Sequence, residues 1–264
     1  GIEGIFYSNI ISSAVMVVML VPTISSNLTG KWNGTLYEAL LRFGLPYVPA
    51  GIATMMIQVI DRPILLALTN KSTVGIYQAN YRLGIFMMLV VSMFDFAWRP
   101  FFLTHAKDPD AKPLFARVLT YFVLLMMGVF LLLSFLLEDI VKLPIFWGRS
   151  ILPPEYWHGL AIVPVVLLGY MFLGISNNLV AGIYIEKKTQ HLPANTFVGA
   201  FINIAVNFLL IPFMGIMGAA LATLFSYAAM ACALYFVVQR FYPIKYEFDR
   251  ITKIAIAGGA VFLL

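Results

Sequence analysis

The fold is decided by the stretch from Gln58 to Pro100, which reads QVIDRPILLALTNKSTVGIYQANYRLGIFMMLVVSMFDFAWRP. It contains two apolar runs that are joined by the short polar turn Thr69–Ser72. Long apolar runs of this kind are typical of helices that cross a bilayer, and a turn this short predicts that the two helices are antiparallel. Charged residues interrupt both runs, although the hydrocarbon core disfavours charge. The stretch therefore predicts a hairpin of membrane helices that carries a polar site.

Two arginines lie at similar distances from this turn. Arg62 precedes Lys71 by nine residues, and Arg82 follows Lys71 by eleven. At about 1.5 Å of rise per residue, both guanidinium groups lie roughly 13–17 Å below the same membrane face, near the middle of a core about 30 Å thick. A charge at that depth costs at least about 2.5–3.5 kcal/mol and is expected to face a bundle interior or a wet cavity. The matched depth predicts a cavity that binds an anionic group.

Two acidic residues of the same stretch leave a structural alternative open. Asp61 adjoins Arg62 and can neutralise either Arg62 or Arg82. Asp95 precedes Arg99 by four residues, which is the favourable order for an ion pair within a helix. Arg99 therefore either joins the cavity or pairs with Asp95. Because ionisable residues inside membrane segments are by default functional, we interpret Arg62 and Arg82 as substrate-binding residues.

The segment from Tyr77 to Arg82 is too polar for a surface that faces lipid. Gln78 and Arg82 share one helix face by their four-residue spacing, Tyr77 and Tyr81 share another, and Asn80 lies between the two faces. We interpret the segment as the lining of the cavity. The alternative is that these side chains make ordinary hydrogen bonds between helices.

The composition of the whole chain indicates a membrane protein. Hydrophobic residues make up 61%, charged residues 11%, and the mean hydropathy is +0.91, whereas a soluble domain has about 25% charged residues. The apolar runs are long and do not alternate with polar residues, which argues against a membrane β-barrel. The fold class is therefore predicted to be all-α, a polytopic transmembrane helical bundle. Cys232 is the one cysteine, so a disulfide framework is excluded.

Seven long helices are expected. They run from Ile5 to Val21, Leu36 to Leu68, Val74 to Leu103, Leu114 to Leu137, Gly159 to Ile185, Pro193 to Ile211 and Ile216 to Val238. Prolines 46, 49 and 63 interrupt the second helix and predict either a static kink or a bend that changes as the cavity opens. Pro63 frees a carbonyl near Val59, beside Asp61, which marks a candidate polar pocket. The final run, Ile254–Leu264, is too short to span, and we interpret the chain as a fragment of a longer transporter-like protein.

The basic residues sort by membrane face in this layout. One face has Lys31, Arg42, Lys107, Lys112, Arg117, Lys187, Lys188, Arg240, Lys245, Arg250 and Lys253, and the other has Lys71, Lys142 and Arg149. The positive-inside rule places the first set in the cytoplasm and the turn at Lys71 outside. Because topology accounts for the net charge of +5, that charge is not a sign of nucleic-acid binding.

Residues for catalysis or metal binding are sparse. His105, His158 and His191 are dispersed, so no metal or other cofactor is predicted. The phosphate-binding pattern G-x-x-x-x-G-K-[ST] and the nucleophile pattern G-x-S-x-G do not occur. An enzyme of envelope glycan assembly would depend on the acids of the outer loops, Glu138, Asp139 and Glu155. This alternative is weaker than transport, and a membrane scaffold is disfavoured by the buried charges.

Several short motifs follow one another in a characteristic order. They are Phe43-Gly44-Leu45-Pro46, Asp61-Arg62, Val74-Gly75-Ile76-Tyr77, Tyr81-Arg82, Glu186-Lys187-Lys188-Thr189, Asn203 with Asn207, Ile211-Pro212 and Gly215-Ile216-Met217-Gly218-Ala219-Ala220. In this order the chain resembles the polysaccharide, or lipid-linked oligosaccharide, flippases of the multidrug/oligosaccharidyl-lipid/polysaccharide exporter superfamily. Each motif is weak alone, but their order and spacing extend over nearly the whole chain.

The resemblance implies one lobe of a two-lobe MATE-like exporter fold in a bacterial plasma membrane. It implies that residues 1–22 are the last helix of the first lobe, 23–35 the interlobe linker, 36–241 the six-helix second lobe, and 242–264 a cytoplasmic loop with part of a further helix. It also implies that an undecaprenyl-pyrophosphate-linked oligosaccharide is flipped by alternating access through a central cationic cavity, with the bilayer and glycan polymerase machinery as partners. The basic cavity residues of such flippases map onto Arg62 and Arg82, and less closely onto Arg99.

Two further readings complete the prediction. Transport coupled to an ion gradient would use Asp61 or Asp95 as the ion or proton site. A multidrug cation exporter of the same superfamily is the main alternative, and it would favour uncompensated acids in the cavity. Here the three arginines of the hairpin stretch outnumber its two aspartates.

Overall fold

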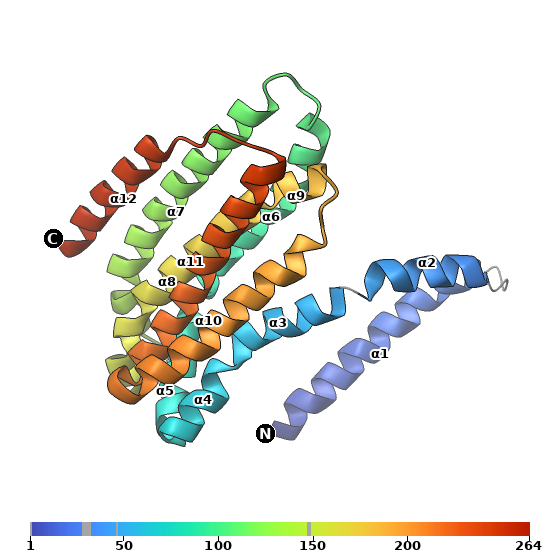
Figure 1. Ribbon diagram of the computed structural model, residues 1–264. Helices are drawn as coiled ribbons and strands as arrows, with labels where there is room; N and C mark the ends of the chain where they lie inside the picture. The colour runs from blue at the N-terminus through green and yellow to red at the C-terminus, as the bar shows by residue number, and fades with distance from the viewer. Residues whose placement is uncertain (1, 28–32, 46, 147–148) are drawn as a thin grey trace. The chain divides into compact units, whose positions relative to one another are not determined.

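The computed structural model describes residues 2–27, 33–45, 47–146 and 149–264, which are almost entirely helical (Figure 1). The helices in chain order are α1 (Ile2–Asn27), α2 (Gly34–Gly44), α3 (Tyr47–Val59), α4 (Asp61–Leu68), α5 (Lys71–Tyr81), η1 (Arg82–Gly84), α6 (Ile85–His105), α7 (Ala111–Lys142), η2 (Pro154–Ile162), α8 (Val163–Leu179), α9 (Ala181–Ile185), α10 (His191–Met214), α11 (Ile216–Phe241) and α12 (Phe248–Leu263). Two short strands, β1 (Pro144–Phe146) and β2 (Arg149–Ser150), pair antiparallel between α7 and η2.

Seven helical stretches are long and apolar enough to cross a membrane within the described residues. They are Phe6–Asn27, Gly51–Leu68, Lys71–His105, Ala111–Lys142, Pro154–Ile185, His191–Met214 and Ile216–Phe241. Each falls on one of the seven long helices expected from the sequence. The prediction of an all-α, polytopic helical bundle is confirmed.

The chain divides into two compact units, residues 1–45 and 46–264. The division follows Leu45, so α1 and α2 belong to the same unit. Helix α1 also continues past Pro22 to Asn27, although the sequence placed its end at Val21. In its last turn Asn27 Nδ2 donates to Thr23 O at 2.8 Å, which satisfies one of the carbonyls left free at the helix end. Residues 28–32 of the predicted linker lie outside the described residues.

The expected helix Leu36–Leu68 is divided into α2, α3 and α4. The break between α3 and α4 lies at Ile60, three residues before Pro63. Pro63 has no backbone N–H, so Val59 O receives no helical hydrogen bond from it. The predicted proline break is therefore present, and Asp61 becomes the first residue of a new helix.

Helices α8, α10 and α11 pack side by side in the second unit, and α3 lies against α10 (Figure 1). Gly215, with φ of +53°, makes the single-residue turn from α10 to α11, a conformation that favours glycine. Buried small residues follow at Gly218, Ala219 and Ala220. Ser226 Oγ donates to Gly199 O at 2.8 Å and joins the two helices. The predicted close helix packing is present here.

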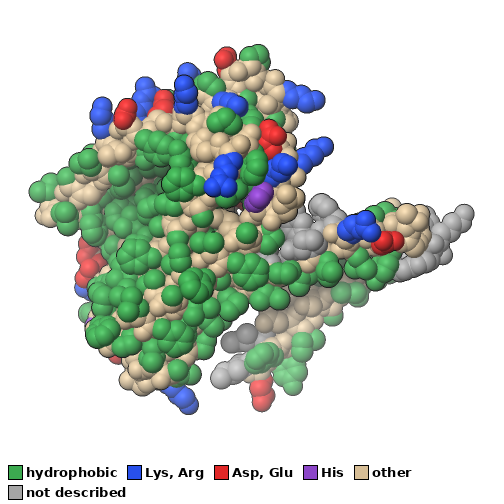
Figure 2. Space-filling view, viewed as in Figure 1, with side chains coloured by type: hydrophobic (Ala, Val, Ile, Leu, Met, Phe, Trp, Pro, Cys, Tyr) green, Lys and Arg blue, Asp and Glu red, His purple; other side chains and the backbone are tan. Residues whose placement is uncertain are grey.

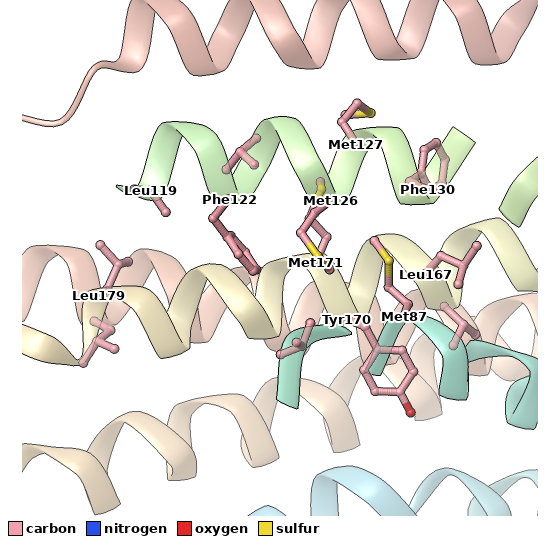
Figure 3. Close-up of a cluster of buried hydrophobic side chains, with 14 of the residues drawn as sticks. Met87, Leu119, Phe122, Met126, Met127, Phe130, Leu167, Tyr170, Met171 and Leu179 are labelled. Atoms are coloured by element: carbon pink, nitrogen blue, oxygen red, sulfur yellow. The ribbon is translucent and has the colours of Figure 1, made fainter. Parts of the chain in front are cut away.

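The largest apolar core lies around α7 and α8 (Figure 3). Phe122 and Met126 on α7 meet Leu167 and Met171 on α8 within this core. Tyr170 also belongs to α8, but its hydroxyl points away from the cluster (Figure 3). The core thus holds α8 in an orientation that directs the Tyr170 hydroxyl to the side of the helix away from the cluster.

Replacing Gly218 with alanine is expected to destabilise the protein. A Cβ atom there would lie 2.6 Å from Leu210 C, and since the obstacle is backbone, α10 and α11 must separate. The expected loss is about 1–3 kcal/mol of the free energy of unfolding, measured by denaturant titration in mixed micelles. Gly128→Ala is the matched control, because nothing lies within 4 Å of a Cβ on Gly128. Equal destabilisation by the two substitutions would contradict the packing argument.

Candidate functional site

A fully buried carboxylate lies at the start of α4. Asp61 has 0% exposure, and it accepts a hydrogen bond at 2.5 Å from the hydroxyl of Tyr77, which is equally buried on α5. The backbone N–H of Arg62 donates to the other carboxylate oxygen at 2.9 Å. A buried carboxylate requires such donors, and hydrogen bonds to an ionised group are among the strongest in proteins. We call Asp61 and Tyr77 the carboxylate centre.

The turn between α4 and α5 sets the register of this contact. Asn70 caps α5 by accepting from Thr73 N at 2.9 Å, and Thr69 Oγ1 donates to Leu65 O at 2.5 Å. Asp61 and Tyr77 are separated by 16 residues and lie at equal distances on either side of Thr69. The short polar turn therefore places the two side chains opposite each other in the hairpin.

Arg62 is half-buried beside the carboxylate centre. Its Nη1 atom donates to Gln58 O at 3.0 Å, near the break between α3 and α4, and its Cζ atom lies 5.7 Å from the ring centroid of Tyr81. The buried Nε atom has no hydrogen-bond partner. No ion pair within 4.0 Å joins Arg62 to a carboxylate in the part of the chain that the structure describes. Arg62 is thus a cation held by a carbonyl and an aromatic face.

Four tyrosines form a continuous row from α5 to α11. Ring centroids are 5.5 Å apart for Tyr77 and Tyr81, 6.2 Å for Tyr81 and Tyr170, and 6.3 Å for Tyr170 and Tyr227. Each of the four is at most 7% exposed. We call these residues the tyrosine row. Gly84 permits the approach of α8, since a Cβ there would lie 2.8 Å from the Tyr170 ring.

Sequence reasoning missed Tyr170 and Tyr227. Both lie in helices that are mostly apolar, and neither tyrosine belongs to a polar segment like the one from Tyr77 to Arg82. Their contact with Tyr81 depends on packing between helices that are far apart in the sequence. No spacing rule within one helix predicts that contact.

Arg82 and Gln78 lie outside the carboxylate centre. Arg82 begins η1 and is exposed, whereas the preceding residue, Tyr81, is buried. Arg62 lies next to the ring of Tyr81, the residue that precedes Arg82. The two arginine side chains differ in exposure, and Gln78 is half-buried.

Asn80 connects α5 to η2. Its Nδ2 atom donates to Tyr156 O and to Ile76 O, at 2.9 Å in each case, and the residue is fully buried. A Cβ on Gly159 would lie 2.2 Å from Asn80 Nδ2, so the glycine makes room for the amide. Asn80 therefore makes the interhelical hydrogen bond that the sequence left open as an alternative to cavity lining.

Asp95 and Arg99 form an ion pair on α6, which is the structural alternative for these residues. Arg99 Nη2 and Asp95 Oδ2 are 2.9 Å apart, and the side chains are 54% and 19% exposed. An exposed pair of this kind contributes at most about 1 kcal/mol. Asp95 Oδ1 is buried without a hydrogen-bond partner. In the described residues, no hydrogen bond or ion pair joins the pair to the carboxylate centre.

Comparisons with protein-family models, with curated proteins and with solved structures give no match. The interpretation of the site therefore depends on the chemistry of the chain's own side chains.

Replacing Tyr77 with phenylalanine is expected to lower the free energy of unfolding by about 1.5–3 kcal/mol, because Asp61 loses a hydrogen bond to a buried charge. The same change in the background of Asp61→Asn should cost less, and the difference measures the coupling between the two side chains. Tyr121→Phe is the control, since Tyr121 is 66% exposed on α7. Denaturant titration of the four variants tests the prediction, and purely additive effects would contradict it.

Proposed function

We propose that the chain forms one lobe of a bacterial plasma-membrane transporter that flips a lipid-linked oligosaccharide with a pyrophosphate group. The observation that carries this proposal is Arg82. It is an exposed cation eleven residues into the candidate span Lys71–His105, and none of the described carboxylates pairs with it. A cation at that depth is costly against lipid, so it requires a wet cavity or another lobe to face.

The side chains near Arg82 fit an anionic ligand. Arg62 lies beside the ring of Tyr81, the residue that precedes Arg82, and keeps a buried Nε donor without a partner. A guanidinium presents several donors in a planar fork, which matches the oxygens of a phosphate group. Two such groups provide fixed positive charge for a pyrophosphate, while Gln78 offers an amide to a sugar hydroxyl.

Flipping requires alternating access and no bond cleavage. The lipid tail stays in the bilayer while the pyrophosphate and the glycan pass through the cationic cavity between the lobes. The protein therefore needs neither a catalytic residue nor a cofactor for this task. Asp61 has a separate role in this scheme: a buried carboxylate on a broken helix is a candidate site for the coupling ion or proton.

The carboxylate centre also favours a second candidate, a multidrug cation exporter. Asp61 is an acid in the bundle interior, and the tyrosine row supplies aromatic faces that attract organic cations. Arg62, which lies over Tyr81, opposes this function because it places a positive charge against the row.

The proposal is tested by reconstituting the full-length protein in liposomes and following a fluorescent lipid-linked oligosaccharide between leaflets. Arg62→Ala and Arg82→Ala are each expected to slow flipping about tenfold to a hundredfold, because each removes a charged hydrogen bond worth about 1.5–3 kcal/mol. Arg240→Ala is the matched control, an exposed arginine at the end of α11. Its flipping rate should equal that of the unmodified protein.

The outcomes separate the candidates. Unchanged flipping in both arginine variants, with normal insertion, would show that these arginines are structural. Efflux of organic cations by the unmodified protein, without flipping, would favour the multidrug exporter. In that case Asp61→Asn should abolish efflux.

A further inference from the structure

A second cationic site lies at the end of the bundle where α7 begins and α11 ends. It is a cavity of about 340 Å³ lined by Lys112, Arg117 and Lys245, together with Pro113, Pro243 and Glu247. The lining comes from the first turns of α7 and from residues 242–247, the segment between α11 and α12. We call it the basic pocket. Figure 2 shows that Lys and Arg side chains gather at this end of the second unit.

The charge of the basic pocket is uncompensated. Glu247 is its acid, and both of its carboxylate oxygens are engaged: Thr120 Oγ1 donates at 2.8 Å and Arg250 Nη1 at 2.9 Å. Among the described residues, no carboxylate lies within 4.0 Å of a side-chain nitrogen of Lys112, Arg117 or Lys245. Three cations therefore surround a cavity whose carboxylate is already satisfied.

The segment between α11 and α12 is held in place, so the pocket has a fixed shape. Gln239 Nε2 donates to Ile244 O at 2.6 Å, and Ile244 N donates to Gln239 Oε1 at 3.0 Å. Ile244 and Tyr246 are buried, while Lys245 between them is exposed. Lys112 Nζ lies 4.8 Å from the ring centroid of Tyr242. Burial raises the pKa of the Tyr242 hydroxyl.

The pocket lies at the ends of two candidate membrane spans. One candidate span begins at Ala111 and another ends at Phe241, so both walls of the pocket come from span ends on the same side. Arg117 is six residues into α7, which is roughly 9 Å along the helix. Positions this close to a span end face the headgroup region, where lipid phosphates are located.

An apolar cavity of about 300 Å³ is lined by residues that are close in the chain to those of the basic pocket, and it favours a lipid over a soluble anion. Leu119 and Val123 line it from the next turns of α7, and Tyr246 and Phe248 line it from the chain that leads into α12. Successive side chains of this segment line different cavities: Lys245 and Glu247 line the basic pocket, and Tyr246 between them lines the apolar cavity. A molecule with an anionic head and an acyl chain matches both.

We propose that the basic pocket binds the phosphate-bearing headgroup of an anionic membrane lipid, with an acyl chain against the apolar cavity. Basic pockets between membrane helices at the cytoplasmic side are suited to such headgroups. The site is remote in sequence from Arg62 and Arg82, and its occupancy does not depend on what the protein transports.

The test is native mass spectrometry of the full-length protein after exchange into mixed phosphatidylglycerol and phosphatidylcholine. The unmodified protein should retain phosphatidylglycerol preferentially. The triple variant Lys112→Gln, Arg117→Gln, Lys245→Gln should lose more than about tenfold of this preference, because each cation near the surface contributes about fivefold. The matched control changes three exposed cations outside the pocket, Lys107→Gln, Lys187→Gln and Arg240→Gln, and should keep the preference.

Three outcomes would overturn the proposal. The first is an equal loss in the two triple variants, which would show that only the total charge matters. The second is the absence of a preference for phosphatidylglycerol in the unmodified protein. The third is displacement of the lipid by millimolar inorganic phosphate, which would assign the pocket to a soluble anion. Equal elution volumes and unfolding midpoints of the variants establish that all of them are folded.

Discussion

The hydrogen bond from Tyr77 to Asp61 is the interaction on which the site depends. A carboxylate with no exposure needs a hydrogen-bond donor, and Tyr77 on the neighbouring helix provides it at 2.5 Å. The turn at Thr69 sets the register of α4 against α5, and this bond stabilises it. The same register carries Tyr81 to Arg62, and Gly84 then lets α8 bring Tyr170 to Tyr81. The proline break matters because it begins a new helix at Asp61.

Buried polar groups in the second unit serve two purposes. Some connect helices: Asn80 joins α5 to η2, Ser226 joins α11 to α10, and Trp98 Nε1 donates to Asn178 O at 3.1 Å between α6 and α8. Others leave donors or charge uncommitted, as Arg62 does with its Nε atom. The distinction explains why only a few of the polar residues in the helices are candidates for ligand binding. A side chain whose hydrogen bonds are used between helices has little capacity left for a substrate.

Much of the helical layout follows from the sequence because membrane spans are long and their apolar runs are local signals. The hairpin of α4 and α5 and the break before Pro63 were predictable because the polar turn and the proline are also local signals. The continuation of α1 past Pro22 was not, because a proline inside a membrane helix removes one hydrogen bond without always ending the helix. Asp61, Arg62, Tyr77 and Tyr81 share one site because four- and sixteen-residue separations are set by the helix and the turn. Tyr170 and Tyr227 were missed, since only the packing of α8 and α11 brings them to that site.

The single-residue turn at Gly215 has a consequence for how the chain enters the bilayer. Helices α10 and α11 have 24 and 26 residues, and the turn between them has no charged side chain. Phe213, next to the turn, is 83% exposed, so even the tip of this hairpin is apolar. Moving such a tip across the membrane costs little free energy, whereas each charged side chain that crosses costs about 2.5–3.5 kcal/mol. The pair is therefore suited to insert as one preformed unit during biosynthesis, with its close glycine and alanine contacts already made.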